Sequence, residues 1–488
     1  MSRVVVIGAG MGGLAAAARL ARLKHDVVVL EQAATVGGKL GWHTEAGFSW
    51  DTGPSVLTIP QALRDLFRKT GKPLEKVLDL AAIQPIAHYR FADGTRLDLP
   101  ATGPVDVERA LSAALGGDAG ADWTRLMQRA SAIWEATRRD FVEAPLDGAA
   151  AMARMAIRRP RDVRTVAPWS SLRDLGSGYL RDPRLQMLLD RYATYSGSDP
   201  RWAPAALACV PYVEQAFGAW YAPGGLRRIA DATAERAQEC GARIRCDTSV
   251  AQVLTEGSRV SGVRLASGEV VPADVVVSGV DASTLYGRLL PRPALLRGIR
   301  RATPSYSAFV LLLGLSGRTA GLRHHSVLFP ADYDAEFDAL RDGRVVDDPA
   351  IYISAPDDAA LRPDDDSESW FVLVNAPRQG EVDWDAPGMA QAYADRVLTM
   401  LAERGYDVRT RVRVRRVRTP ADIERDSCSP GGAIYGTSSN GARSAFLRPA
   451  NRSPVPGLFL VGGSAHPGGG LPLVILSAAI VADLVGPA

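Results

Sequence analysis

Residues 4–31 read VVVIGAGMGGLAAAARLARLKHDVVVLE, an apolar run followed by a glycine-rich turn, an alanine-rich run and a second apolar run. The pattern predicts a strand, a helix and a second strand, over residues 4–7, 14–23 and 27–31. The turn has the spacing Gly-x-Gly-x-x-Gly, stands directly after the first strand and opens the helix, which is the context that this motif requires. The chain is therefore expected to begin with a βαβ unit.

The three motif glycines predict a turn that binds the phosphates of a dinucleotide. Gly8 permits a tight turn, Gly10 lets the backbone approach a pyrophosphate, and Gly13 lets the helix pack closely on the strand. The free N–H groups at the start of the helix add a partial positive charge that attracts phosphates. Glu31, at the end of the second strand, is expected to accept hydrogen bonds from ribose hydroxyls, which favours an adenosine without a 2′-phosphate.

A second glycine pair distinguishes between dinucleotides. Gly37, Gly38 and Lys39 would place two more N–H groups and a cation beside the pyrophosphate, and they resemble the second fingerprint of the large flavoprotein class that includes amine oxidases and carotenoid desaturases. A further Gly-x-Gly-x-x-Gly after a mid-chain strand, as NADPH would need, is absent from the sequence. We therefore expect FAD as the cofactor, reduced by a substrate and not by a nicotinamide.

The end of the chain has the same glycine-rich style as its beginning. Residues 462–472 read GGSAHPGGGLP and separate a predicted strand over 458–461 from a predicted helix over 473–485. Such a turn lets the backbone lie against a flat ring, and the helix behind it would stabilise negative charge on a reduced flavin. The expected cofactor contacts in this turn are Gly462, Gly463, Ser464, Gly470 and Leu471. One domain is thus expected to contain both ends of the chain.

Taken together, these segments resemble the bacterial carotenoid (phytoene-type) desaturase family of FAD-dependent oxidoreductases, and the resemblance covers the whole chain. Other segments that carry it are residues 51–55 (DTGPS), 224–226 (GGL), 273–278 (ADVVVS), 324–330 (HHSVLFP) and 446–449 (FLRP). The resemblance implies that Gly53, Pro54 and Ser55 pass over the flavin. Many related flavoproteins have an acid where this chain has Gly463, and Ser464 is the substitute that the sequence offers.

The resemblance implies an α/β fold. A Rossmann-like FAD-binding domain would be built from both chain ends, with a substrate-binding β-sheet and a helical, membrane-associating cap interleaved with it. The expected parts are residues 1–85, 226–300 and 421–488 for the FAD-binding domain, 86–225 for the substrate region and helical cap, and 301–420 for the substrate-binding domain. A length of 488 residues also exceeds one core of about 100 to 200 residues.

The resemblance further implies a carotenoid substrate, a long apolar polyene that loses two hydrogens so that its conjugation is extended. A hydride would pass to flavin N5 and a proton would leave the adjacent carbon, with oxygen or a quinone as the final electron acceptor. His466, in the closing turn, is the side chain expected to accept the proton, with Asp140 and Glu143 in a helical insertion as further candidates.

Two further features concern the substrate. Residues 431–436 (GGAIYG), together with the closing turn, look closer to enzymes that act at the ends of acyclic carotenoids, by 3,4-desaturation or terminal oxidation, than to phytoene enzymes. Several aromatic residues are candidates for lining a polyene channel, although aromatic residues in helices are more often part of the core: Trp123, Trp134, Trp202, Tyr212 and Trp220.

Three alternatives stay open on the sequence alone. An amine-oxidase-type flavoprotein would share the nucleotide motifs, and a carotenoid terminal oxidase or ketolase of the same family would share the substrate. A nucleic-acid binder would use the arginines that alternate with valines over residues 408–418. That alternation predicts a strand with one solvated face, and no aromatic platform accompanies the arginines, so we expect no nucleic-acid partner.

The charge balance and the cysteines exclude other classes. The 57 basic and 54 acidic residues leave a net charge of +3, which is too balanced for a nucleic-acid footprint. The four cysteines form no Cys-x-x-Cys pair and the six histidines show no metal-ligand spacing, so we expect a reduced, cytoplasmic protein without a metal. No apolar stretch reaches the ~18 residues that a membrane-spanning helix needs.

The excess positive charge is concentrated in residues 150–184. This segment contains three aspartates and eight arginines, which are Arg154, Arg158, Arg159, Arg161, Arg164, Arg173, Arg181 and Arg184. Met152, Met155, Ile157 and Trp169 stand among them, and basic segments with apolar side chains suit an anionic membrane surface. We expect a cytoplasmic, peripherally membrane-associated protein that collects its substrate from lipid; the alternative is a solvated helical face.

Overall fold

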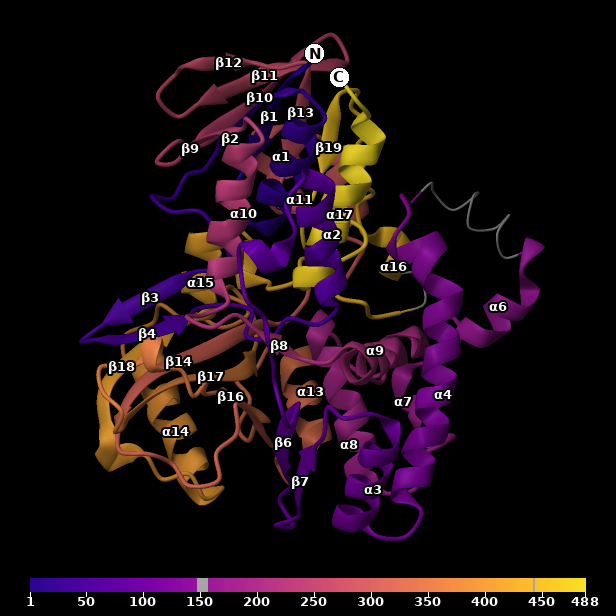
Figure 1. The fold of residues 1–488 in the computed structure, drawn as a ribbon, viewed down its shortest axis with the longest axis vertical. Helices are drawn as coiled ribbons and strands as arrows, with labels where there is room; N and C mark the ends of the chain where they lie inside the picture. Colours follow the sequence, from indigo (N-terminus) through magenta and orange to yellow (C-terminus); the bar gives the residue numbers. More distant parts are fainter. Residues whose placement is uncertain (147–156, 442–443) are drawn as a thin grey trace.

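A computed structural model describes residues 1–146, 157–441 and 444–488 (Figure 1). A five-stranded parallel sheet lies in the upper half of Figure 1, close to both chain ends. Its strands, in spatial order, are β19 (Leu458–Leu460), β13 (Val275–Ser278), β1 (Arg3–Ile7), β2 (Asp26–Leu30) and β9 (Arg243–Arg245). The two ends of the chain therefore contribute to one sheet, as the sequence predicts.

Both faces of this sheet are covered. Val4 and Val6 of β1 pack on a helical layer that contains α1 (Met11–Arg22), α2 (Pro60–Thr70), α10 (Arg227–Glu239) and α17 (Leu471–Val485). Val5 and Ile7 pack on a small antiparallel sheet that contains β10 (Val250–Glu256), β11 (Arg259–Leu265) and β12 (Val270–Pro272). Because both faces are buried, the β1 sequence is a continuous apolar run and does not alternate with polar residues.

A seven-stranded sheet lies in the lower half of Figure 1. Its order is β18 (Val412–Arg418), β14 (Ser307–Ser316), β17 (Ser367–Ala376), β16 (Ile351–Ser354), β15 (His325–Leu328), β6 (Ala87–Arg90) and β7 (Arg96–Leu99). Leu311 and Leu313 of β14 share a core with α14 (Met389–Glu403), whereas Val310 and Leu312 on the opposite face pack with Phe48. Phe48 belongs to the hairpin of β3 (Trp42–Glu45) and β4 (Phe48–Asp51).

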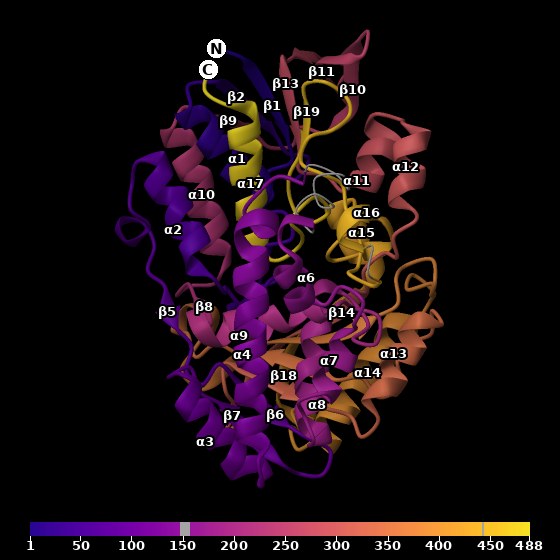
Figure 2. The same ribbon diagram turned by 90° about the vertical axis from the view of Figure 1, so that its right-hand side faces the viewer.

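The helical insertion forms a column along one side of the molecule, and this side faces the viewer in Figure 2. Its elements are α3 (Pro104–Leu115), α4 (Ala119–Thr137), the π-helical turn η2 (Arg138–Val142), α6 (Pro160–Val166), α7 (Leu172–Ser177), α8 (Pro183–Arg191), η3 (Tyr192–Ser196), η4 (Ala205–Ala208) and α9 (Cys209–Phe217). Leucine and alanine side chains of this column belong to the same core as the helical layer of the parallel sheet.

Short elements connect these layers. They are η1 (Leu74–Lys76), β5 (Ala81–Ala82), β8 (Trp220–Tyr221), α11 (Ala282–Thr284), η5 (Leu285–Leu289), α12 (Pro293–Ile299), α13 (Tyr333–Arg341), η6 (Ala359–Leu361), η7 (Arg409–Arg411), α15 (Pro420–Ser427), η8 (Pro430–Gly432) and α16 (Ser444–Leu447). The strands β5 and β8 pair with one another.

The expected α/β fold class is confirmed, with differences at the element ends. Helix α1 begins at Met11, three residues earlier than predicted, because Gly12 and Gly13 already belong to its first turn. Helix α17 begins at Leu471 instead of residue 473. The limits of the five predicted domain segments stay a prediction; β6 and β7 from the segment 86–225 join the sheet of the segment 301–420.

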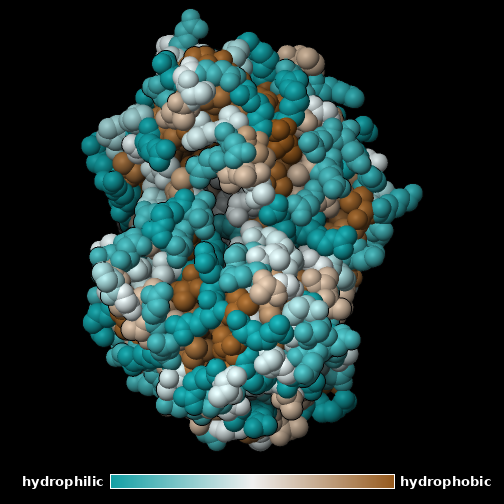
Figure 3. Space-filling view, turned by 90° about the vertical axis from the view of Figure 1, so that its left-hand side faces the viewer, coloured by the Kyte–Doolittle hydropathy of each residue, from teal (hydrophilic) through white to brown (hydrophobic). Residues whose placement is uncertain are grey.

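Surface features of the structure bear on two questions, whether β18 forms an open basic stripe and whether a helix could span a membrane. The arginines of β18 do not form an open basic stripe, since three of them pair with aspartates: Arg413–Asp364, Arg415–Asp395 and Arg418–Asp426. Among the described residues, no helix combines the length and apolar character needed to cross a bilayer. The face in Figure 3 is mostly hydrophilic and is hollowed between its upper and lower halves.

Candidate functional site

A cavity of about 1260 Å³ lies between the parallel sheet, the seven-stranded sheet and the helical column. Its wall includes the loops that follow β1, β2, β13 and β19, all at the carboxyl ends of parallel strands. In open parallel sheets this edge is where ligands bind. The volume exceeds the roughly 300 to 1,000 Å³ of ordinary small-molecule sites, so the cavity has room for more than one ligand.

The turn between β1 and α1 has the geometry that a phosphate site needs. Gly8 has a φ of +91°, in the left-handed region that favours glycine. A Cβ on Gly13 would lie 2.0 Å from the carbonyl oxygen of Gly8, so only glycine allows the helix to approach the strand this closely. Gly10 precedes the first residue of α1 and lines the cavity, with no atom within 4 Å of where its Cβ would stand.

The second glycine loop packs directly on the first. The N–H of Gly37 donates to the carbonyl oxygen of Ala9 at 2.8 Å, and a Cβ on Gly38 would lie 3.1 Å from the Cα of Gly10. Both Gly37 and Gly38 have positive φ and line the cavity. The two loops thus form one wall of bare backbone, as the sequence motifs predict.

The Glu31 carboxylate lies at this wall and is already partly engaged. Its Oε2 accepts from the N–H of Ala9 at 2.6 Å, and its Oε1 accepts from the N–H of Ala33 at 2.9 Å. A carboxylate offers about four acceptor positions, so two bonds leave capacity for ribose hydroxyls. The residue is 7% exposed and lines the cavity, so a ligand in the cavity can reach it.

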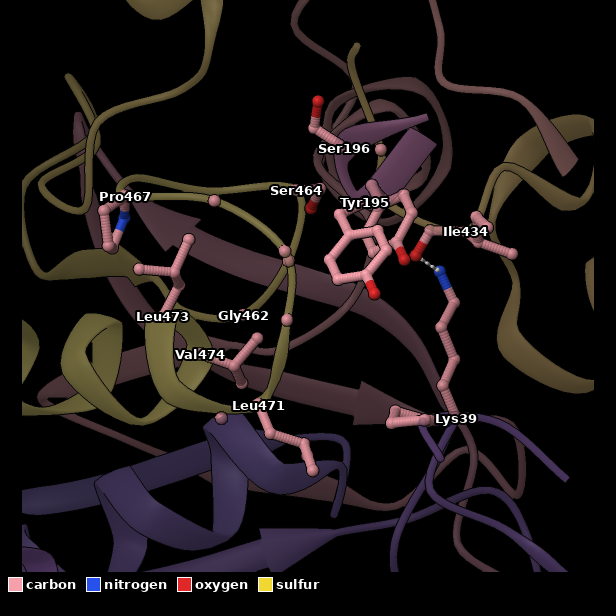
Figure 4. Close-up of a pocket in the computed structure, with 18 of the residues that line it drawn as sticks. Lys39, Tyr195, Ser196, Ile434, Gly462, Ser464, Pro467, Leu471, Leu473 and Val474 are labelled. Atoms are coloured by element: carbon pink, nitrogen blue, oxygen red, sulfur yellow. Dashed lines mark hydrogen bonds between the residues drawn. The ribbon is translucent and has the colours of Figure 1, made fainter. Parts of the chain in front are cut away.

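Lys39 lies further along the wall, opposite the loop before the closing turn (Figure 4). Its ammonium group donates to the carbonyl oxygens of Ala433 and Ile434, at 2.9 and 3.0 Å. Burial lowers the pKa of Lys39 to about 8, and the nearby Asp281 carboxylate opposes this shift. The lysine is therefore a partly desolvated cation that is held by two main-chain oxygens. Its ammonium group has fewer N–H donors left for a pyrophosphate than the sequence suggests.

Residues 53–55 run along the cavity beside Lys39. A Cβ on Gly53 would lie 1.8 Å from the carbonyl oxygen of Lys39, which explains the glycine. Pro54 and Ser55 line the cavity, and the Ser55 hydroxyl lies 2.7 Å from the hydroxyl of Tyr352 in β16.

The closing turn supplies the opposite wall. Gly462 and Gly470 have φ of +106° and +103°, and Gly470 precedes α17, which adds a second helix N-terminus to the cavity. Figure 4 shows Leu471 at the start of α17 beside the same space as Lys39. Ser464 is engaged elsewhere, since its hydroxyl accepts from the N–H of Ala282 at 3.1 Å.

The structure brings an acid to this turn that the sequence analysis missed. Asp281, in the loop after β13, lines the cavity and lies next to Ser464 across Gly436. One of its carboxylate oxygens accepts from the N–H of Ser283 at 2.8 Å and caps α11. Asp281 thus supplies a carboxylate close to the turn that has Gly463 where related flavoproteins have an acid. Its position after the returning strand 275–278 was the available signal.

Arg448 was also missed as an individual residue, although the segment 446–449 was noted. Its buried guanidinium donates to the carbonyl oxygens of Tyr435, Thr437 and Gly463. Burial lowers the pKa of Arg448 to about 10, and the Asp281 carboxylate opposes the shift. The arginine therefore ties the closing turn to the loop that carries residues 435–437.

His466 is 1% exposed and connects the closing turn to the helical column. Its Nε2 lies 2.7 Å from the carbonyl oxygen of Phe141 and 3.0 Å from that of Ala144. Because carbonyl oxygens only accept, the proton of the ring must be on Nε2, and burial lowers the pKa of His466. Its Nδ1 is therefore unprotonated, but this atom is enclosed and has no partner in the described part of the chain.

Asp140 and Glu143 are not brought into the cavity. Asp140 pairs with Arg159, and Glu143 lies 3.8 Å from Arg138 at the surface of the helical column. Neither carboxylate belongs to the cavity wall, so the structure does not support a proton-acceptor role for them. The physical reason is that the π-helical turn η2 directs its apolar residues Phe141 and Val142 inward instead.

The rest of the cavity is an apolar chamber between the seven-stranded sheet and the helical column. Its wall includes Trp134, Val210, Val213, Val310, Phe371 and Leu373. Of the five aromatic residues proposed for a polyene channel, only Trp134 lines it; Trp123 is a buried core residue and Trp202 is 59% exposed. Within the described residues, no group of three or more His, Cys, Asp or Glu side chains is arranged to hold a metal ion.

These observations fit an extended dinucleotide with a flat ring system. The glycine loops leave space and N–H groups for a pyrophosphate, and Glu31 and Asp281 offer acceptors for hydroxyl groups on either side of it. The start of α17 directs a partial positive charge to the far end of the same cavity. The residues present therefore suit FAD.

Comparison with known proteins agrees with this site. The chain matches the family of flavin containing amine oxidoreductases over residues 11–486. It is 33% identical to 4,4′-diapolycopene oxygenase of Methylomonas sp, over 99% of this chain and 98% of that protein. It is also 33% identical to hydroxyneurosporene desaturase of Cereibacter sphaeroides (99% and 98%), and 32% identical to zeta-carotene-forming phytoene desaturase of Myxococcus xanthus (99% and 93%).

Solved structures share the fold at much lower identity. Putrescine oxidase bound to putrescine matches with a TM-score of 0.66 and 16% identity, over 99% of both chains. An oxidoreductase from Methanosarcina mazei matches with a TM-score of 0.64 and 16% identity, over 99% of this chain and all of the other. The amine-oxidase alternative thus has less support than the carotenoid one. The chain belongs to the flavin containing amine oxidoreductases, groups there with the carotenoid desaturases and oxygenases, and is an oxidoreductase with FAD as its cofactor.

Proposed function

We propose that this protein desaturates a long, acyclic carotenoid near one end of the polyene. The observation that carries the proposal is the continuity of one cavity from the glycine loops into an apolar chamber. An apolar polyene would lose no hydrogen bonds to water on entering such a chamber, whereas an amine would need polar or aromatic partners there. Relatives at 31 to 33% identity are named for hydroxyneurosporene, a 1-hydroxycarotenoid and diapolycopene, which are carotenoids.

The cofactor contacts follow from the wall of the cavity. The loops at Gly10 and Gly38 would hold the pyrophosphate, Glu31 the adenosine ribose, and Asp281 the hydroxyls of the ribityl chain. The flavin ring would lie between residues 53–55 and the closing turn. The proposed set in the wall is Gly8, Gly10, Glu31, Gly37, Gly38, Lys39, Gly53, Pro54, Ser55, Asp281, Gly462, Gly463, Ser464, Gly470 and Leu471. Gly13 is outside the wall and would act through the close packing of α1 on β1. When bound, FAD supplies a two-electron acceptor for a hydride from the substrate.

The residues of the chain have mainly a positioning task in this reaction. The apolar walls exclude water and hold the polyene extended, which brings one bond into a fixed place. His466 has the unprotonated Nδ1 that a proton acceptor needs, but this nitrogen is enclosed, so we propose that the ring first of all holds the closing turn against η2. We propose oxygen or a quinone as the final electron acceptor, because the sequence has one dinucleotide motif with a strand before it.

We propose that the cavity opens at α6 and that this mouth is the site of a peripheral membrane association. Arg159, Asp162, Val163 and Val166 line the cavity at α6, next to the π-helical turn. Around this mouth, several basic and apolar side chains are exposed: Ile157, Arg158, Arg161, Arg164 and Trp169. Such a surface suits an anionic bilayer, from which a water-insoluble polyene would enter.

Fewer arginines of the predicted basic segment belong to the proposed membrane surface than the sequence suggests. Arg154, Met152 and Met155 lie outside the described residues. Three other arginines are held in ion pairs away from the mouth, Arg173 with Asp190 and Asp334, Arg181 with Asp118 and Asp122, and Arg184 with Asp93 and Asp182. The proposed membrane surface therefore centres on α6 and its flanks.

Reconstitution tests the proposed function. The purified, FAD-loaded protein is added to liposomes that contain an acyclic carotenoid, and products are separated by chromatography and weighed by mass spectrometry. A product that has lost two hydrogens supports desaturation, and one that has gained oxygen supports terminal oxidation, the activity named for the Methylomonas relative. Anaerobic mixing should bleach the flavin without added NADPH. Oxidation of amines with no conversion of any acyclic carotenoid would overturn the proposal.

A further inference from the structure

A cation in the cavity wall has no hydrogen-bonding partner among the described residues. Arg191 is the last residue of α8 and lines the cavity. Its guanidinium lies over the rings of Tyr195 and Tyr352, 5.5 and 5.3 Å from their centres. Within the described residues its side chain makes no hydrogen bond and no ion pair within 4.0 Å, and its Nε is completely covered. The remaining surface of the guanidinium therefore faces the cavity.

A neighbouring buried acid, Glu214, is engaged with tyrosines and not with this cation. Glu214 of α9 is 2% exposed and instead accepts from the hydroxyl of Tyr192 at 2.6 Å and from that of Tyr195 at 3.4 Å. Burial raises the pKa of Glu214, while Arg191 and the two hydroxyls oppose this shift. Because both tyrosine hydroxyls donate to the carboxylate, neither can donate to a ligand. The guanidinium of Arg191 is therefore the group that has N–H donors available for a ligand.

A small void extends this polar end of the cavity. It measures about 10 Å³ and is lined by Arg191, Glu214, Tyr352, His325 and Tyr89, together with apolar side chains. The Tyr352 hydroxyl lies 2.8 Å from Nδ1 of His325, and the other ring nitrogen of this histidine has no partner within the described part of the chain. A void of about 10 to 15 Å³ with several polar neighbours has room for one oxygen atom of a water or a ligand.

The cost of this arrangement points to a ligand. A buried charge without hydrogen bonds is unfavourable, and folded proteins rarely keep one without a use. A pure hydrocarbon in the chamber would cover the guanidinium and leave it unpaired. An oxygen atom at the end of the polyene would accept its hydrogen bonds and remove that cost.

We propose that Arg191, together with Glu214, Tyr192 and Tyr195, forms a binding site for an oxygen-bearing end group of the polyene, a hydroxyl or a carbonyl. The proposal rests on the proposed function and deepens it, since it names the substrate class. If the oxygenated end of the polyene is held at Arg191, its position determines which bond of the polyene lies at the flavin side of the cavity. Two relatives are named for hydroxylated substrates, hydroxyneurosporene desaturase and 1-hydroxycarotenoid 3,4-desaturase.

Matched substrates provide the test. The FAD-loaded parent protein and its Arg191→Met variant are each given an acyclic carotenoid and the same carotenoid with a terminal hydroxyl or a terminal aldehyde. We expect the parent to prefer an oxygenated end by about 10- to 100-fold in kcat/KM, the range of one charge-assisted hydrogen bond. Arg191→Met should lose this preference, so that the ratio of kcat/KM for the oxygenated and the hydrocarbon substrate falls to about one. Arg191→Lys should restore part of the preference, because it keeps the charge.

Tyr212→Phe is the matched control. Tyr212 stands on α9 two residues before Glu214 and does not line the cavity, so its variant should keep the preference of the parent. If the Arg191→Met variant cannot be purified with FAD bound, inhibition of the parent enzyme tests the end-group site. An acyclic isoprenoid alcohol should then inhibit the parent more strongly than the hydrocarbon of equal length.

The outcomes separate the two proposals. A parent that converts neither class of substrate contradicts the proposed function. A parent that converts both at equal rates, with equal inhibition by alcohol and hydrocarbon, contradicts only the end-group site. An Arg191→Met variant that keeps the preference but has an altered flavin spectrum or weaker FAD retention would assign the arginine to the cofactor and overturn the inference.

Discussion

The ammonium group of Lys39 donates to the main-chain carbonyl oxygen of Ile434, with 3.0 Å between Nζ and O. A second bond of 2.9 Å reaches the carbonyl oxygen of Ala433. The glycine loop near the beginning of the chain is thereby joined to the segment that precedes the closing turn. One side chain thus holds two parts of the cavity wall that are far apart in sequence.

This position of Lys39 predicts a pH-dependent stability of the FAD-free protein. Its pKa in the folded state is about 8, below the ordinary 10.5, so between these pH values the unfolded chain keeps a proton that the folded chain has lost. The free energy of unfolding should rise across this window by on the order of 3 kcal/mol, with no slope from Lys39 below pH 8. Denaturant unfolding should show that Lys39→Met lacks the rise and that Lys69→Met, at an exposed site, keeps it. Equal slopes in both variants would contradict the assignment.

The motif glycines predict two separable defects. Gly10→Ala should fold normally, because Gly10 has an ordinary negative φ and open space around it, but its new methyl group would stand in the cavity and weaken FAD binding. Gly13→Ala should unfold at a clearly lower temperature, since its Cβ would clash with the carbonyl oxygen of Gly8. Thermal unfolding and FAD titration of both variants distinguish these effects. A Gly13→Ala variant as stable as the parent would refute the packing argument.

Replacement of Glu31 tests the adenosine end of the cofactor. Glu31→Gln keeps an oxygen for the N–H of Ala9 but removes the charge, and should weaken FAD binding by about 1 to 3 kcal/mol. Calorimetric titration of the FAD-free protein gives this value directly. Glu45→Gln, on the exposed β3 hairpin, is the control and should bind FAD like the parent. Unchanged affinity in Glu31→Gln would place the ribose elsewhere.

His466 has two candidate roles that a pair of variants separates. If the ring holds the closing turn against η2, then His466→Gln should keep most of the activity, because an amide N–H can donate to the carbonyl oxygen of Phe141, whereas His466→Ala should lose stability. If Nδ1 accepts the proton, both variants should lose about 10² to 10⁴ in kcat. We expect the first pattern, and the second would restore His466 as the proton acceptor.

Charge reversal at the cavity mouth tests the membrane surface. Arg158, Arg161 and Arg164 are exposed, and changing all three to glutamate should abolish salt-sensitive binding to anionic liposomes. Co-sedimentation measures the bound fraction. The control has the same charge change at Arg297, Arg300 and Arg301, which are exposed at α12 and do not line the cavity. Equal losses in both triple variants would indicate a general charge effect and not a membrane face at α6.

Much of the cofactor site could be predicted because its constraints are local. A φ of +91° at Gly8 or a Cβ clash at Gly13 depends on a few neighbouring atoms, so the glycine spacing alone indicates the turn. The continuous apolar runs of β1 and β13 likewise indicate strands buried on both faces. The sequence itself thus determined the βαβ start, the contribution of both chain ends to one sheet, and the dinucleotide motif.

The partners of individual charges were decided by the tertiary structure alone. Asp281 and Arg191 belong to segments that look ordinary in sequence. Only long-range packing brings Asp281 to the closing turn and leaves Arg191 in the cavity wall without a hydrogen-bonding partner among the described residues. The same packing keeps Asp140 out of the cavity wall and pairs it with Arg159 beside that wall. The physical reason is that a charged side chain takes its role from what lies within a few ångströms of its end, and in this fold those neighbours come from distant parts of the chain.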